Sequence, residues 1–170
     1  MNDYLKECKK LSLTARAAIA LLVFKRYCEM HNLRGAELDK YFEHLWQWPL
    51  IDDPSLFDPW QSSRPYLVDF GLGDEASTEL IDLLSSVGLS EERFRPIAET
   101  ATLILWESFW GAAEDSVAMD HLERGLLASK LTEFPVLTPF KFSRFEQRDG
   151  WGDYITEQDR DFWRDCARYA

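Results

Sequence analysis

Residues 90–113 read SEERFRPIAETATLILWESFWGAA, and this stretch predicts a helix that the rest of the chain encloses. At about 100° per residue its apolar side chains project to nearly every side of a helix, whereas a helix on a protein surface keeps one polar face. These side chains are Leu103, Ile104, Leu105, Trp106, Phe109 and Trp110. Because proline is tolerated only near the start of a helix, we expect the helix proper to begin near Pro96, run to Trp110 and end at Gly111.

Apolar residues at helical spacing predict further helices around this one. They cover about residues 14–31, 36–47, 75–87 and 115–130, and a last helix that follows Thr156 and buries Phe162 and Cys166. The expected N-caps are Thr14, Asp74 and Thr156. A chain of 170 residues that is 46% hydrophobic has enough apolar material for one core. We therefore predict an all-α fold, a single-domain irregular bundle of about six helices over residues 1–170.

Two segments interrupt the helical pattern. Residues 49–73 contain four prolines and two glycines, which disfavour a long helix, together with aromatic side chains that disfavour a solvated linker. We expect a long ordered loop there. In residues 133–155 aromatic and basic residues are interleaved, which predicts an extended aromatic arm with a possible short strand. The interleaved residues are Phe140, Lys141, Phe142, Arg144, Phe145 and Arg148.

The sequence contains no motif for catalysis or cofactor binding. A glycine-rich phosphate loop and the HExxH, GxSxG and EF-hand patterns are missing. Glu99 and Glu107 would lie roughly 12 Å apart along one helix, too far to act on one substrate atom. A tertiary site of His44, His121 and Glu43 is left open as a hydrolase alternative. We predict a protein that is not an enzyme and binds no metal or cofactor.

The cysteines and the apolar runs indicate a cytoplasmic protein. Three cysteines without paired spacing predict buried thiols in a reducing compartment. The apolar run Ala17–Phe24 is shorter than the ~20 residues of a membrane span, and acidic residues interrupt the basic segment before it. We therefore expect no membrane association.

The acidic charge is concentrated in the middle of the sequence. The net charge is -11, and residues 35–92 alone hold thirteen acidic and two basic residues. Crowded like charges destabilise a fold, and one reason to retain them is a cationic partner whose approach they steer. A generic acidic surface is the alternative. The predicted partner-binding residues are Asp52, Asp53, Asp58, Glu75, Glu79 and Asp82, with Trp48 and Trp60 as aromatic anchors.

The arm offers a different interpretation. Interleaved aromatic and basic residues are typical of proteins that bind single-stranded nucleic acid. A net charge of -11 opposes this, so we expect no direct nucleic-acid binding. The second hypothesis is a helical adaptor or regulatory protein that uses residues 140–151 on a protein or nucleic-acid partner.

In size, in its aromatic-rich helical composition and in the cluster from Asp52 to Asp82, the chain resembles the small acidic immunity proteins of bacterial toxin-immunity pairs, including those of contact-dependent growth inhibition. The resemblance implies a protein without catalytic activity that binds one cognate toxin domain, often a basic nuclease, and occludes its active site with an acidic surface. The basic residues among the first 34, with a net charge of +4, depart from a uniformly acidic surface.

Overall fold

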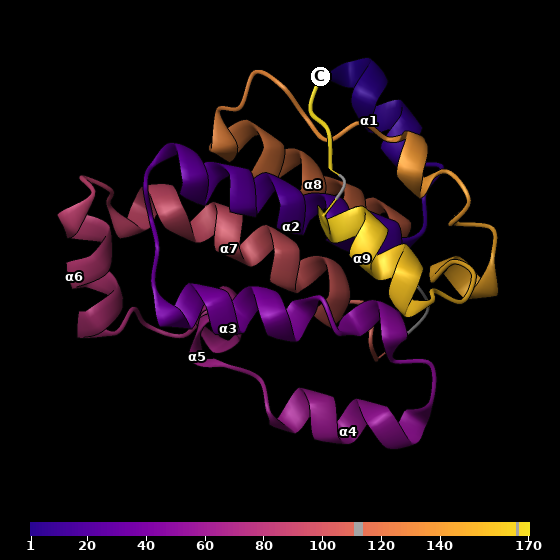
Figure 1. The fold of residues 1–170 in the computed structure, drawn as a ribbon, viewed down its shortest axis with the longest axis horizontal. Helices are drawn as coiled ribbons and strands as arrows, with labels where there is room; N and C mark the ends of the chain where they lie inside the picture. Colours follow the sequence, from indigo (N-terminus) through magenta and orange to yellow (C-terminus); the bar gives the residue numbers. More distant parts are fainter. Residues whose placement is uncertain (111–113, 166) are drawn as a thin grey trace.

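The computed structural model describes residues 1–110, 114–165 and 167–170, and this part of the chain is helical (Figure 1). The α-helices are α1 (Asn2–Cys8), α2 (Leu13–Met30), α3 (Ala36–Leu45), α4 (Pro54–Ser62), α5 (Tyr66–Gly71), α6 (Thr78–Ser86), α7 (Glu91–Trp106), α8 (Asp115–Ser129) and α9 (Glu157–Asp165). Three short 3-10 helices are η1 (Trp48–Leu50), η2 (Thr138–Phe140) and η3 (Arg148–Gly150). The described residues form no strand, only isolated bridges from Leu11 to Arg144 and from Pro135 to Tyr169. The all-α prediction is confirmed.

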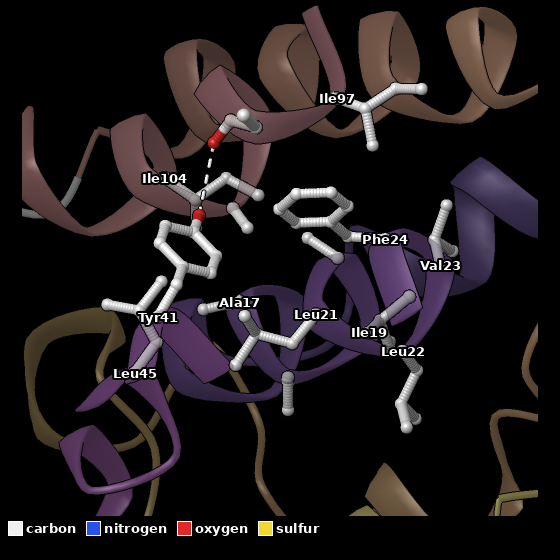
Figure 2. Packing of buried hydrophobic residues seen from close by; sticks show 14 of the residues in the cluster. Ala17, Ile19, Leu21, Leu22, Val23, Phe24, Tyr41, Leu45, Ile97 and Ile104 are labelled. Atoms are coloured by element: carbon white, nitrogen blue, oxygen red, sulfur yellow. Dashed lines mark hydrogen bonds between the residues drawn. The ribbon is translucent and has the colours of Figure 1, made fainter. Parts of the chain in front are cut away.

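Helix α7 lies at the centre of the bundle, as its sequence predicts, and packs against α2, α5 and α8. Figure 2 shows Phe24 of α2 reaching toward α7, where Ile97 and Ile104 point back at it. Helix α2 is also enclosed, with apolar residues buried all round it. Helices α2 and α7 therefore form the centre of the fold, and neighbouring helices pack around this pair.

The limits of the central helix differ from the prediction. Helix α7 begins at Glu91, so Pro96 lies inside it, and the helix ends at Trp106. Pro96 has no N–H, so α7 lacks one backbone hydrogen bond. Phe94 and Ile97, which flank Pro96 in the sequence, are buried in the core. The prediction that Trp110 is enclosed assumed that the helix continues to this residue. Because α7 ends at Trp106, Trp110 is instead 74% exposed. Gly111, the expected end of the helix, lies outside the described residues.

Two glycines let neighbouring helices approach α7 closely. A Cβ atom on Gly125 of α8 would overlap Thr100, and one on Gly71 of α5 would lie 2.5 Å from Thr102 Oγ1. The Thr100 hydroxyl donates within α7 to Pro96 O (2.8 Å) and lies 3.0 Å from His121 O of α8. The Thr102 hydroxyl lies 2.9 Å from the Tyr41 hydroxyl of α3, which also donates to Ala98 O of α7 (3.1 Å).

Residues 49–73 are not the long loop that we predicted but contain η1, α4 and α5. Pro49, Pro54 and Pro65 lie at the starts of helices, and Pro59 is accommodated inside α4. Pro54 occupies the first turn of α4, whose N-cap Asp53 accepts a hydrogen bond from Ser55 N–H (2.7 Å), and Pro65 is the N-cap of α5.

Helix caps also differ in part from the prediction. Ser12 caps α2 and Ser77 caps α6 in place of Thr14 and Asp74. Thr14 Oγ1 instead donates to Trp151 O (2.7 Å). The N-cap expected at Thr156 is confirmed, because its hydroxyl accepts from Asp159 N–H (3.1 Å) at the start of α9. Phe162, expected to be buried by the last helix, is 49% exposed, and Cys166 lies outside the described residues.

The segment 133–155 packs on the body of the protein and contains η2 and η3 in place of a strand. Phe140 is buried against Trp163 of α9, and the Trp163 indole donates to Pro139 O (2.9 Å). Within the described residues no helix is both long and apolar enough to cross a membrane.

Candidate partner-binding site

The six acidic residues predicted to bind a partner are all exposed, but they form two clusters. Asp52 and Asp53 precede α4 and Asp58 lies on it, and we call these three residues the α4 cluster. Glu75 precedes α6, which carries Glu79 and Asp82, and these three form the α6 cluster. Figure 1 places α4 and α6 at different edges of the molecule. A single flat partner surface would therefore engage one cluster at a time.

Neither cluster is neutralised by nearby basic residues. Lys40 and Arg64, the two basic residues in 35–92, are both paired, with Glu37 (2.6 Å) and Asp69 (2.6 Å). Across the described residues no acid of either cluster makes an ion pair. The hydrogen bond from Ser55 lowers the pKa of Asp53, so this carboxylate is charged at neutral pH.

Trp60 is a core residue and not the exposed anchor that we predicted. Only 4% of it is exposed, its indole N–H donates to His44 O (3.0 Å), and its ring stacks on His44 with ring centroids 4.8 Å apart. The physical reason is the helical conformation of residues 54–62, which turns Phe57 and Trp60, three residues apart, to the same inner face.

An aromatic cluster under α4 holds this helix against the body. Trp48, the other predicted anchor, is half-buried there, with its ring centroid 4.8 Å from that of Phe109 and 5.2 Å from that of Trp151. The members are Trp48, Phe57, Trp60, Trp106, Phe109 and Trp151. Aromatic pairs at these separations stabilise the packing beyond the area that they bury. The cluster thus fixes the position of α4, which carries Asp58 and follows Asp52 and Asp53.

Two exposed apolar residues beside the α4 cluster were missed in the sequence. Leu56 on α4 is 46% exposed, and Trp110 packs edge-on against Phe57 with ring centroids 6.0 Å apart while most of it faces solvent. A helical reading of residues 54–62 turns Phe57 and Trp60 inward and leaves Leu56 on the flank of α4, about 160° around the helix axis from Asp58. No sequence signal marks Trp110, because its exposure depends on where α7 ends.

The histidines do not share a site. His44 is buried beneath Trp60, and burial, with a smaller effect of Arg64, lowers its pKa to about 4. His121 of α8 instead lies 2.8 Å from Glu107 Oε2. In the described part of the chain no three or more His, Cys, Asp and Glu side chains are placed to hold a metal ion. The hydrolase alternative therefore gains no support from geometry.

A groove of about 690 Å³ lies between α2, α3 and α9. Its floor is apolar, with Leu38, Phe42 and Trp46, and its walls carry both signs of charge. Arg160 and Arg164 on α9 are engaged by Asp161 (2.8 and 3.1 Å), and Asp39 and Glu43 stand on α3. The groove therefore favours neither a cationic nor an anionic ligand.

Comparison of the chain with protein-family models, with curated proteins and with solved structures found no match.

Proposed function

We propose that this chain is a non-catalytic binding protein, of the immunity type that the sequence resembles, and that it holds a basic protein on the α4 cluster. The observation that carries the proposal is the combination of three exposed acids without ion-pair partners in the described structure and two exposed apolar side chains beside them. Leu56 and Trp110 are these apolar residues.

Such a surface has the usual composition of a protein interface. Aromatic side chains near the centre of an interface supply most of the binding energy, and charges at the rim raise the association rate and exclude wrong partners. Trp110 is the natural anchor here because it is already packed against Phe57 on one side. Its ordering on binding would therefore cost less entropy than that of a freely rotating side chain.

A nuclease toxin domain is a suitable partner on chemical grounds. An enzyme that binds nucleic acid presents lysine and arginine side chains to phosphates, and this surface surrounds its active site. The α4 cluster would compete for the same cations. The proposed inhibition is thus occlusion of the toxin's substrate surface and requires no chemistry by this chain.

Two matched charge variants test the proposal. The α4 variant carries Asp52→Asn, Asp53→Asn and Asp58→Asn, and asparagine at 53 preserves the N-cap. The α6 variant carries Glu75→Gln, Glu79→Gln and Asp82→Asn, which changes the net charge equally. Each protein is used to capture partners from source-cell lysate at low and at high salt, followed by mass spectrometry.

We expect the unmodified protein and the α6 variant to retain one basic protein at low salt, and the α4 variant to lose it. Co-expression then tests neutralisation, because the captured protein should be toxic alone and harmless with the unmodified chain. Equal retention by both variants, or no retained basic protein, would contradict the proposal.

The adaptor hypothesis based on residues 140–151 has weaker support. Phe140 is buried, Arg144 pairs with Glu146 (3.2 Å), and the Arg148 guanidinium lies 3.8 Å from the centroid of the Tyr154 ring. Phe142 is 44% exposed and is the residue on which this alternative depends. If the Phe142→Ser variant retains the same partner, the adaptor hypothesis is contradicted.

A further inference from the structure

A second hollow, of about 320 Å³, lies where α2 and α8 end and α7 begins. Its charged and polar lining includes Tyr27 and His31 from the end of α2, Arg93 from α7, and Lys130 after α8. Arg93 and Trp106 are thirteen residues apart on α7, roughly 20 Å at 1.5 Å per residue, so this hollow is remote from the aromatic cluster and from α4.

The hollow is locally basic in an acidic protein. Arg93 and Lys130 make no ion pair with any described residue, and Glu92 is the acidic residue that stands with them in the lining. Burial lowers the pKa of His31, and the positive charge of Arg93 lowers it further. Two cations facing one acid favour an anionic ligand.

Tyr27 supplies a second, independent indication of a ligand. The residue is 2% exposed, its ring lies beside His31 with centroids 4.5 Å apart, and its buried hydroxyl has no hydrogen-bond partner among the described residues. Leaving a buried hydroxyl unpaired destabilises the folded protein. An oxygen acceptor from a ligand in the hollow would satisfy it.

We propose that this hollow binds a small organic anion, with its oxyanion between Arg93 and Lys130 and within reach of the Tyr27 hydroxyl. Met30, Pro96 and Ala128 form apolar walls for the rest of the ligand. The ligand is thus a phosphate ester or a carboxylate with an apolar body, and 320 Å³ is within the usual range for a small-molecule site. The inference does not depend on the proposed function, which concerns α4.

Calorimetric titration with inorganic phosphate, phenyl phosphate and benzoate, all in chloride buffer, tests the site. We expect phenyl phosphate to bind more tightly than inorganic phosphate because its ring contacts the apolar walls, and comparison with benzoate identifies the preferred head group. Arg93→Gln should weaken binding about tenfold or more, since a charge-assisted hydrogen bond is lost. Arg144→Gln, the same charge change near the start of α2, should leave it unchanged.

The Tyr27→Phe variant tests whether the Tyr27 hydroxyl binds a ligand or has only a structural role. Without ligand, the variant should melt at the same or a higher temperature, because it removes an unpaired hydroxyl; with phenyl phosphate, it should show a smaller rise in melting temperature than the unmodified protein. The proposal is overturned if neither phenyl phosphate nor benzoate binds at millimolar concentration. It is also overturned if Arg93→Gln binds as well as Arg144→Gln, or if Tyr27→Phe retains the full rise.

Discussion

Arg16 on α2 is a fully buried cation that joins three distant parts of the chain. Its guanidinium donates to Cys8 O (3.1 Å) and Lys9 O (2.7 Å) at the end of α1 and lies 2.7 Å from the Asp115 carboxylate at the start of α8. It also lies over the ring of Phe145 in the arm. Burial lowers the pKa of Arg16, but the partners keep the group charged.

Replacement of Arg16 should therefore be costly. Arg16→Met leaves two carbonyls and Asp115 without their donor, and we expect a loss of ~3–5 kcal/mol in the free energy of unfolding. Arg124→Met, which breaks an exposed pair with Glu99, should cost less than about 1 kcal/mol. Urea unfolding measures both, and similar losses would show that the buried pair contributes no more than a surface pair.

The two tryptophans beside α4 should respond in opposite ways. Trp60→Ala opens a cavity in the aromatic cluster and should lower the free energy of unfolding by ~3–5 kcal/mol. Trp110→Ala should leave stability nearly unchanged and weaken binding of the basic partner. Chemical unfolding and binding kinetics measured on both variants distinguish these outcomes. Unchanged partner affinity in Trp110→Ala would remove this residue from the interface.

His44 should make the fold sensitive to acid. Its pKa is about 4 in the folded protein against an ordinary value near 6.5, so the unfolded chain binds the proton first as the pH falls. Titration of His44 therefore leaves the free energy of unfolding unchanged above pH ~6.5. It lowers that free energy as the pH falls toward ~4, by up to ~3 kcal/mol. His44→Phe keeps an aromatic ring on Trp60 and should show a flatter pH profile of unfolding free energy. Identical profiles would contradict the assignment.

At the scale of elements, the contact of α8 with α7 depends on the missing side chain of Gly125. Alanine in place of a helical glycine normally stabilises by up to about 1 kcal/mol. Here we expect Gly125→Ala to destabilise by ~1–3 kcal/mol, because the new methyl overlaps Thr100. Glu123→Ala on the exposed side of α8 is the control. Thermal unfolding gives the sign, and a higher melting temperature for Gly125→Ala would show that the helices can separate freely.

The sequence predicts the long helices well and the short ones poorly. Periodicity located α2, α7 and α8, where apolar residues repeat over several turns. Helices α1 and α5 have seven and six residues, too few for a periodic signal, whereas α6 and α9, with nine residues each, were predicted. In α4 the prolines predict breaks, although Pro54 lies at the first helical position, where proline is favoured. Because of this error Trp60 was predicted to be an exposed anchor, and Leu56 was not recognised as an exposed residue. The acids were assigned correctly to the surface because their charge alone requires water.

For the whole molecule, the unbalanced charge should reduce stability in the absence of a partner. Mutual repulsion among the acids of residues 35–92 opposes compaction, and salt screens it. We expect the α4 variant to melt at a higher temperature than the unmodified protein at low salt, with the difference shrinking at high salt. Calorimetry at two salt concentrations checks this. A lower melting temperature for the variant would mean that these acids stabilise the fold and are not held for a partner.

Residues that come much later in the chain form hydrogen bonds with the start of α2. Ser12 N–H donates to Ser143 O (3.0 Å), Phe145 N–H donates to Lys10 O (3.1 Å), and Thr14 donates to Trp151. While the protein is being made, α2 leaves the ribosome on the order of 10 s before these partners, at about 5–20 residues per second. During that interval the start of α2 lacks these hydrogen-bond partners, although α7 and α8, which pack on α2, are made earlier. A chaperone that covers the start of α2 until residues 143–151 emerge would therefore raise the yield of folded protein.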